Sequence, residues 1–325
     1  MLGTPYCNPT TVTQAPTGVS WSLLPDSDST EAEQQAALIA VCWRATSRID
    51  TYCNQVLRAT ADTEYLTGPG APRCNVDRNT GNGVLNMKRW PVTSVLAIQV
   101  SSNRDFPRAW SAVPAGLWDV RHPLLFSGDS ASATAPDGGW TIDVAPGYIG
   151  WSPWGRTRTG GYTGSGGRNS QRVQVSYING WPHTSLTEAA SAADTVLNVD
   201  DVTGWTGASG FAYDGAATEP LAVESVSANS PLVLPNGAGT AQAGPGTVTL
   251  TAPLGFDHEQ GTLVSALPAT VIEAAIYAAC FQALESGIDA VAVQDLSGRQ
   301  VSSSEVSADL ETSYRKLLDS FRRVM

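Results

Sequence analysis

The sequence is poor in charge and in the patterns that usually carry catalysis. Only 15% of its 325 residues are charged, and its three histidines have no metal-ligand spacing. Neither a GxSxG nor a HExxH motif occurs, and no Lys-Ser/Thr follows the glycine-rich residues 161–168. Asp257-His258-Glu259 is expected to be a turn, because neighbouring loop side chains rarely all face one ion. We therefore predict no catalytic site, no metal and no cofactor.

Paired cysteine motifs and long apolar runs are also missing. The five cysteines form no CxxC pair, and Cys42, Cys53 and Cys280 fall on apolar helix faces, so we expect buried free thiols. The sequence does not open with a basic segment followed by an apolar run, and we expect a protein folded in a reducing cytoplasm. The most apolar stretch, residues 267–287, is too short and too often interrupted for a membrane span, so no membrane partner is expected.

Basic residues are missing from one long segment. Residues 185–265 hold nine acidic residues and no lysine or arginine, in a chain of net charge −11. Residues 144–187 hold no acid but four arginines, namely Arg156, Arg158, Arg168 and Arg172. The acidic body argues against tight nucleic-acid binding over the whole surface, although DNA could pass nearby without adhering. The four arginines are equally consistent with two roles. They could belong to a solvated loop, or they could contact a phosphate backbone or the acids of a neighbouring subunit.

Two segments have the apolar periodicity of core helices. In residues 267–287, apolar side chains recur at three- and four-residue steps, and Pro268 suits the first turn. A second apolar stripe runs through residues 30–57, where Thr30 and Glu33 fit a capping box. We expect these two helices to pack on each other.

A terminal helix is expected to have two distinct faces. Its apolar face holds Leu310, Tyr314, Leu317, Leu318, Phe321 and Val324, and its basic face holds Arg315, Lys316, Arg322 and Arg323. Isolated helices of this length are marginal in water, so the apolar stripe needs a cover. A partner protein could provide that cover, or the helix could fold back onto residues 267–287.

The remaining segments are typical of short strands between glycine- and proline-bearing turns. In residues 172–178, Val173, Val175 and Tyr177 alternate with polar residues, which predicts one buried face. We expect an α+β fold: a helical core (N-terminal, Pro268-led and C-terminal helices) with antiparallel β elements and an inserted small all-β module. The expected domains are an N-terminal arm (1–28), the first part of the core (29–184), the all-β module (185–265) and the second part of the core (266–325).

Tryptophan is abundant for a chain of this kind. Four of the ten tryptophans, Trp140, Trp151, Trp154 and Trp181, crowd the glycine-rich middle of the sequence. They suit a small β core or a subunit interface, or, if exposed, a surface that stacks on sugar rings.

Several short segments occur in a recognisable order. They are Ile49-Asp50-x-Tyr52-Cys53, Tyr65-Leu66-Thr67, Arg89-Trp90-Pro91-Val92-Thr93-Ser94-Val95, a VxVSYxxGW strand from Val173, the Pro268-led helix, Ser297-Gly298, and Leu317-Leu318-x-x-Phe321-Arg322-Arg323. In this order the chain resembles the head–tail connector (adaptor) proteins of long-tailed bacteriophages. The likeness covers residues 30–180 and 267–325, and RWPVTSV with the terminal helix is its strongest part.

The resemblance implies a structural virion protein of the neck, assembled in the host cytoplasm. It implies a homo-oligomeric ring, expected to be dodecameric, beneath the portal protein and with a channel for DNA ejection. Both faces of the terminal helix would dock on the portal, and the opposite side of the ring would receive the next neck protein, a head-closure or tail-terminator protein. DNA would make only transient, non-specific contacts, for which the four arginines are candidates.

Residues 185–265 depart from the minimal family pattern. They resemble a β module that is inserted in some phage connector and tail proteins, including its Glu219 and His258-x-x-Gly261. Two other functions stay open. One is a carbohydrate-binding phage tail or baseplate protein that uses the tryptophans, and the other is an enzyme of unknown reaction.

Overall fold

The computed structural model describes residues 3–17, 19, 21, 24, 28–67, 73–76, 82–101, 109–121, 141–145, 149, 172–214, 217–285 and 303–323. The structure is mostly β, with 36% strand and 29% helix. The expected fold class, a helical core with a small β module, is therefore wrong. The chain divides into two units: Met1–Ala59, Trp181–Ser230 and Gly244–Met325 form the first, and Thr60–Gly180 and Pro231–Ala243 form the second.

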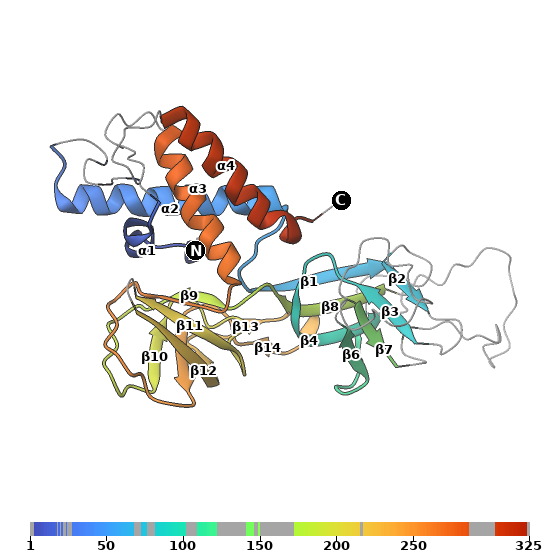
Figure 1. Cartoon of the computed structure of the whole chain (residues 1–325). Helices are drawn as coiled ribbons and strands as arrows, with labels where there is room; N and C mark the ends of the chain where they lie inside the picture. Colours follow the sequence, from blue (N-terminus) through green and yellow to red (C-terminus); the bar gives the residue numbers. More distant parts are fainter. Residues whose placement is uncertain are drawn as a thin grey trace, which may run out of the picture. The chain divides into compact units, whose positions relative to one another are not determined.

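The helices of the first unit lie together (Figure 1). Their apolar side chains form one buried cluster. The helices are α1 (Pro9–Gln14), α2 (Glu31–Cys53), α3 (Ala269–Glu285) and α4 (Ser303–Leu318), followed by the 3-10 turn η3 (Asp319–Phe321). The predicted packing of α2 on α3 is confirmed, since Leu38, Val41 and Ile49 share the cluster with Val271 and Ile272. Five alanines of α3 are fully buried, which lets neighbours approach it closely on several sides: Ala274, Ala275, Ala278, Ala279 and Ala283. None of the described helices is long and apolar enough to cross a membrane.

Helix α2 begins where its local sequence indicates but ends four residues earlier than the predicted range, at Cys53. The predicted capping box is present: the Glu33 N–H donates to the Thr30 hydroxyl at 3.4 Å, and the Thr30 N–H donates to Glu33 Oε2 at 2.8 Å. The helix ends before residue 57, because Asn54 adopts a left-handed conformation with φ of 55°. The expected free thiols are also confirmed: all five cysteines are unpaired and buried.

The first unit also contains a curled, six-stranded antiparallel half-barrel. Its strand order is β10 (Val196–Val199), β15 (Gly246–Leu250), β12 (Ala217–Ala228), β11 (Ser209–Asp214), β16 (Leu263–Ser265) and β9 (His183–Ser185). Its own apolar cluster surrounds the fully buried Trp205. Polar contacts link this sheet to the residues before α1, since His183 Nε2 donates to the carbonyl of Pro5 at 2.8 Å and the hydroxyls of Thr4 and Ser185 lie 3.4 Å apart.

The second unit contains two four-stranded antiparallel sheets and a hairpin. One sheet has the order β1 (Thr60–Thr67), β8 (Arg172–Asn179), β4 (Val92–Ser101), β5 (Ser111–Ala112). The other has the order β2 (Cys74–Val76), β3 (Gly83–Asn86), β7 (Thr141–Val144), β6 (Trp118–Arg121). The hairpin joins β13 (Leu232–Val233) and β14 (Thr240–Ala241). Just before β4, the Trp90–Pro91 bond is cis, and Arg89 pairs with Asp62 at 2.8 Å.

Strand β8 differs from its expected pattern, because both of its faces are buried. Its polar residue Gln174 is only 1% exposed. The side-chain amide of Gln174 donates to the carbonyl of Pro235 at 3.2 Å, and the amide of Asn236 donates to Gln174 Oε1. The turn of the β13–β14 hairpin therefore covers the face that the sequence predicts to be exposed.

Candidate functional site

The apolar face of α4 is covered within the chain. Tyr314 and Leu318 are 1% and 0% exposed, and the Tyr314 ring centroid lies 6.0 Å from that of Phe281 on α3 and 6.5 Å from that of Tyr52 on α2. The half-buried Leu310, Leu317 and Phe321 pack against the same cluster. Two ways to bury the apolar face of this helix were considered. The structure shows the second, in which the helix packs against residues 267–287 of the same chain. The buried Tyr314 and Leu318 cannot meet a portal protein while α4 stays packed, and Val324 lies outside the described residues.

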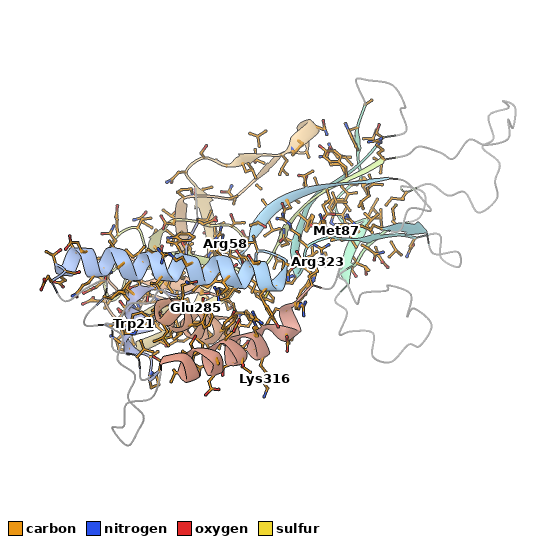
Figure 2. All side chains as sticks on the ribbon, turned by 90° about the horizontal axis from the view of Figure 1, so that it is seen from above. Trp21, Arg58, Met87, Glu285, Lys316 and Arg323 are labelled. Atoms are coloured by element: carbon orange, nitrogen blue, oxygen red, sulfur yellow. The ribbon has the colours of Figure 1, made fainter. Side chains whose placement is uncertain are left out.

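The basic face of α4 and η3 is accessible. Arg315, Lys316 and Arg322 are exposed, whereas Arg323 is half-buried and its backbone N–H donates to the carbonyl of Cys53 at 3.0 Å. Figure 2 shows the side chain of Lys316 directed away from the other helices. Among the predicted docking residues, these cations and the half-buried apolar residues are therefore the ones that a partner could reach.

Helices α2, α3 and α4 enclose an open hollow of about 560 Å³, here called the arginine hollow. Its lining residues are Arg44, Ser47, Arg48, Thr51, Tyr52, Gln282, Tyr314 and Arg315. The sequence-based reasoning found Arg315 but missed Arg44 and Arg48. Their signal was present, since two arginines four residues apart on a helix share one face. The sequence did not indicate, however, that α4 would place Arg315 beside these two arginines.

Two of the three arginines are held by neighbouring side chains. Arg48 Nη2 lies 3.0 Å from Glu285 Oε2, and its guanidinium lies 4.6 Å from the centroid of the Phe281 ring. Arg315 Nη2 lies 2.6 Å from Glu311 Oε1, one turn earlier on α4. Such carboxylate and aromatic contacts fix the planar guanidinium and leave further N–H donors free to bind.

Tyr52 organises the end of the hollow next to α4. Its hydroxyl donates to Asp319 Oδ1 at 2.6 Å, and this hydrogen bond is the main cause that raises the pKa of Tyr52 above its usual value. The guanidinium carbons of Arg315 and Arg322 lie 5.8 and 5.5 Å from the Tyr52 ring centroid. Arg44, by contrast, is exposed and makes no ion pair with any residue that the structure describes. The hollow and its rim thus combine four arginines with three carboxylates, of Glu285, Glu311 and Asp319, so a positive charge remains.

The other predicted contact residues are not part of this hollow. Arg156, Arg158 and Arg168 lie outside the described residues, as do Trp140, Trp151 and Trp154. Arg172 is exposed at the start of β8 in the second unit. Trp181 is half-buried in the helical cluster, with its ring centroid 5.6 Å from that of Phe321, so it fills the core rather than offering a face to a sugar.

A second polar cluster lies around His258, between β15 and β16. His258 is buried, with Nε2 at 3.0 Å from Glu219 Oε2 and Nδ1 at 3.3 Å from Asp214 Oδ2. Burial acts to raise the pKa of Glu219, but hydrogen bonds from the Gly255 N–H and from His258, with the charge of His258, bring it below its usual value. His258 therefore connects the β15–β16 loop to β11 and β12.

The neighbours of His258 in sequence do not join it. Asp257 Oδ1 instead accepts a hydrogen bond from the Ala192 N–H at 2.7 Å, and Glu259 is exposed. Within the described ranges, no group of three or more histidine, cysteine or acidic side chains could hold a metal ion. The partners of His258, Asp214 and Glu219, come from distant positions, so only the fold could reveal them.

The arginine hollow is an accessible and partly preorganised surface for anionic or polar groups. Its arginines and tyrosines are residue types that are enriched in the energetically important parts of protein interfaces. No protein-family model, no curated protein and no solved structure matches the chain. The residues described above are therefore the basis of the functional proposal.

Proposed function

We propose that this chain is a subunit of a bacteriophage head–tail connector, which forms a homo-oligomeric ring beneath the portal and provides a channel for DNA. The observation that carries the proposal is the helical cluster of the first unit. Helix α2, from the early part of the chain, packs with α3 and α4, from its end, in the element order on which the resemblance to connector proteins rests. RWPVTSV supports the proposal further by leading into the central strand β4.

The distribution of charge supports an assembly of identical subunits. The helices of the first unit present the arginine hollow, whereas residues 185–265 carry nine acids and no lysine or arginine. Opposite charges on different surfaces of one subunit favour head-to-tail contacts, and such contacts close into a ring when the rotation between subunits permits it. An acidic channel wall would let DNA pass, because cationic contacts are what hold the phosphate backbone.

Portal docking is retained as part of the proposal, with a smaller set of residues. The exposed Lys316 and Arg322 are the best placed candidates, because the buried Tyr314 and Leu318 hold α4 on its own chain. Their charges would orient the ring on an acidic portal surface more than they would add affinity. The next neck protein would bind the opposite side of the ring.

Electron microscopy and light scattering of the purified full-length chain test the proposal. We expect closed rings with a central opening and a mass that is an integer multiple of the 34.1 kDa subunit, with twelve copies as the expected number. A chain that stays monomeric up to about 1 mM, where even a weak association is populated, would contradict the proposal. A monomer that bound immobilised glycans would instead favour the carbohydrate-binding alternative, which no described residue supports at present.

A further inference from the structure

We propose that the arginine hollow receives the acidic loops of a neighbouring copy of the same chain. This inference rests on the proposed ring, and it identifies the two surfaces that meet between subunits. The acidic loops are the β9–β10 and β15–β16 connections, with the exposed carboxylates of Glu188, Asp194, Asp257 and Glu259.

The hollow is suited to bind carboxylates. An arginine presents five N–H donors in a planar fork, so the single carboxylates beside Arg48 and Arg315 leave donors unused. Arg44 is exposed and has no acidic partner among the described residues. The aromatic rings of Tyr52 and Tyr314 line the same hollow and would exclude water from a bound partner.

The acidic loops have the complementary charge and a defined shape. The backbones of Ala190 and His258 exchange two hydrogen bonds of 2.9 and 2.7 Å, which hold the two loops side by side. Backbone N–H groups of Ser191 and Ala192 donate to Asp194 and Asp257 at 2.8 and 2.7 Å and fix these carboxylates. The buried His258 holds the β15–β16 loop to the sheet through its contacts with Asp214 and Glu219.

Nothing within the described part of the chain neutralises these loops. Glu188, Asp194, Asp257 and Glu259 make no ion pair with any described residue, and residues 185–265 contain no lysine or arginine of their own. A nucleic acid is a poor occupant of the hollow, since only four arginines, offset by three nearby carboxylates, would face a polyanion on an acidic protein. A second copy supplies carboxylates in a fixed arrangement, and each copy offers both surfaces, as a head-to-tail ring requires.

Charge reversal on the full-length chain tests this contact. Arg44→Glu changes the hollow, and Glu259→Lys changes the acidic loops; neither residue has an ionic partner among the described residues. Lys316→Glu on the outer side of α4 and Glu224→Lys on β12 are the matched controls, because both residues are exposed and outside the two surfaces. Thermal melting of each variant establishes that the subunit is folded, and Arg44→Gln provides a milder change at the same place.

We expect Arg44→Glu and Glu259→Lys each to raise the concentration at which rings form by about tenfold or more, the usual scale for a close charge pair between proteins. The two controls should assemble like the wild type. Mixing Arg44→Glu with Glu259→Lys chains should restore assembly, because each hollow then meets a loop of opposite charge in an alternating ring.

The outcomes separate this inference from the proposed function. If the wild type forms no ring, the ring proposal itself fails, and this contact fails with it. If the wild type forms rings and the folded Arg44→Glu and Glu259→Lys variants assemble equally well, the ring stands and the contact is wrong. Rings of Arg44→Glu that assemble normally but no longer bind a portal would assign the hollow to the portal, which also overturns the contact.

Discussion

The helices and the six-stranded sheet of the first unit bury their apolar residues in different ways. A helix satisfies its own backbone hydrogen bonds, so α3 can be covered on most of its sides by small and apolar neighbours. A strand directs alternate side chains to opposite faces, as the alternating burial of β10 and β15 shows. The outer face of the sheet and its loops therefore stay polar, and there the acids accumulate.

Breaking the sheet core should give the largest effect. Val248 is fully buried in β15, and Val248→Asp should cost more than about 4 kcal/mol of unfolding free energy because it buries an unpaired charge. We expect the helices to unfold in the same transition, since the sheet and the helices belong to one unit. Urea unfolding followed by helical circular dichroism and by tryptophan fluorescence checks this. Ser227→Asp, on the exposed side of β12, is the control, and helices that stayed folded after loss of the sheet would show two independent domains.

Loosening the helical cluster should have the next largest effect. Tyr314→Ala removes a buried ring from the contact of α4 with α2 and α3, and should cost about 3 to 4 kcal/mol. Lys316→Ala on the outer side of the same helix should leave the melting temperature nearly unchanged. Equal melting of the two variants would mean that α4 contributes little to this cluster and is free to dock elsewhere.

Two titratable groups of the first unit, the buried His183 and the half-buried Asp50, should respond to pH in opposite directions. Burial lowers the pKa of His183 from its usual 6.5 to about 4, and burial raises the pKa of Asp50 from 3.8 to about 6. As the pH falls from 6.5 to 4, the unfolded chain protonates His183 first, so stability is lost. As the pH falls from 6 to 3.8, the folded chain protonates Asp50 first, so stability is gained. At about 1.4 kcal/mol per pKa unit, each effect amounts to about 3 kcal/mol.

Replacing either group should reveal the pH dependence of stability that the other group causes. In Asp50→Asn, the unfolding free energy should fall by about 3 kcal/mol between pH 6.5 and 4 relative to the pH dependence of the wild type, because the gain from Asp50 is gone. In His183→Gln it should rise over the same range relative to the wild type. Urea unfolding at pH 6.5, 5.3 and 4 measures both slopes. Parallel curves for the three proteins would show that these pKa shifts are absent.

The capping box of α2 should show the smallest effect. Thr30→Ala removes the side-chain oxygen that accepts the Glu33 N–H, and should cost about 1 kcal/mol. Thr30→Ser keeps this oxygen and should stay close to the wild type. The measurement is urea unfolding at neutral pH, and an unchanged Thr30→Ala variant would mean that the start of α2 adds nothing to the stability of the cluster.

Local chemistry in the sequence was enough to predict the main helices and the strand at residues 172–178. The capping box at Thr30 and the apolar stripes of α2 and α3 depend on residues a few positions apart, so they can be recognised without the fold. The burial of Cys42, Cys53 and Cys280 follows from the same stripes. The fold class was wrong because residues 185–265 were taken as a small appendage, whereas they form most of a six-stranded half-barrel in a chain with more strand than helix.

Contacts between distant residues were decided only by the tertiary structure. The apolar face of α4 could equally have been covered by a partner protein. Only the packing of α4 shows that Tyr314 and Leu318 are buried within their own chain. Gln174 is buried because it contacts Pro235 in a hairpin 61 residues away in sequence, and His258 meets Glu219 across 39 residues. The arginine hollow likewise exists only because α4 brings Arg315 beside Arg44 and Arg48. Periodicity reports which face of an element is apolar, but it contains no information about which other element will cover that face.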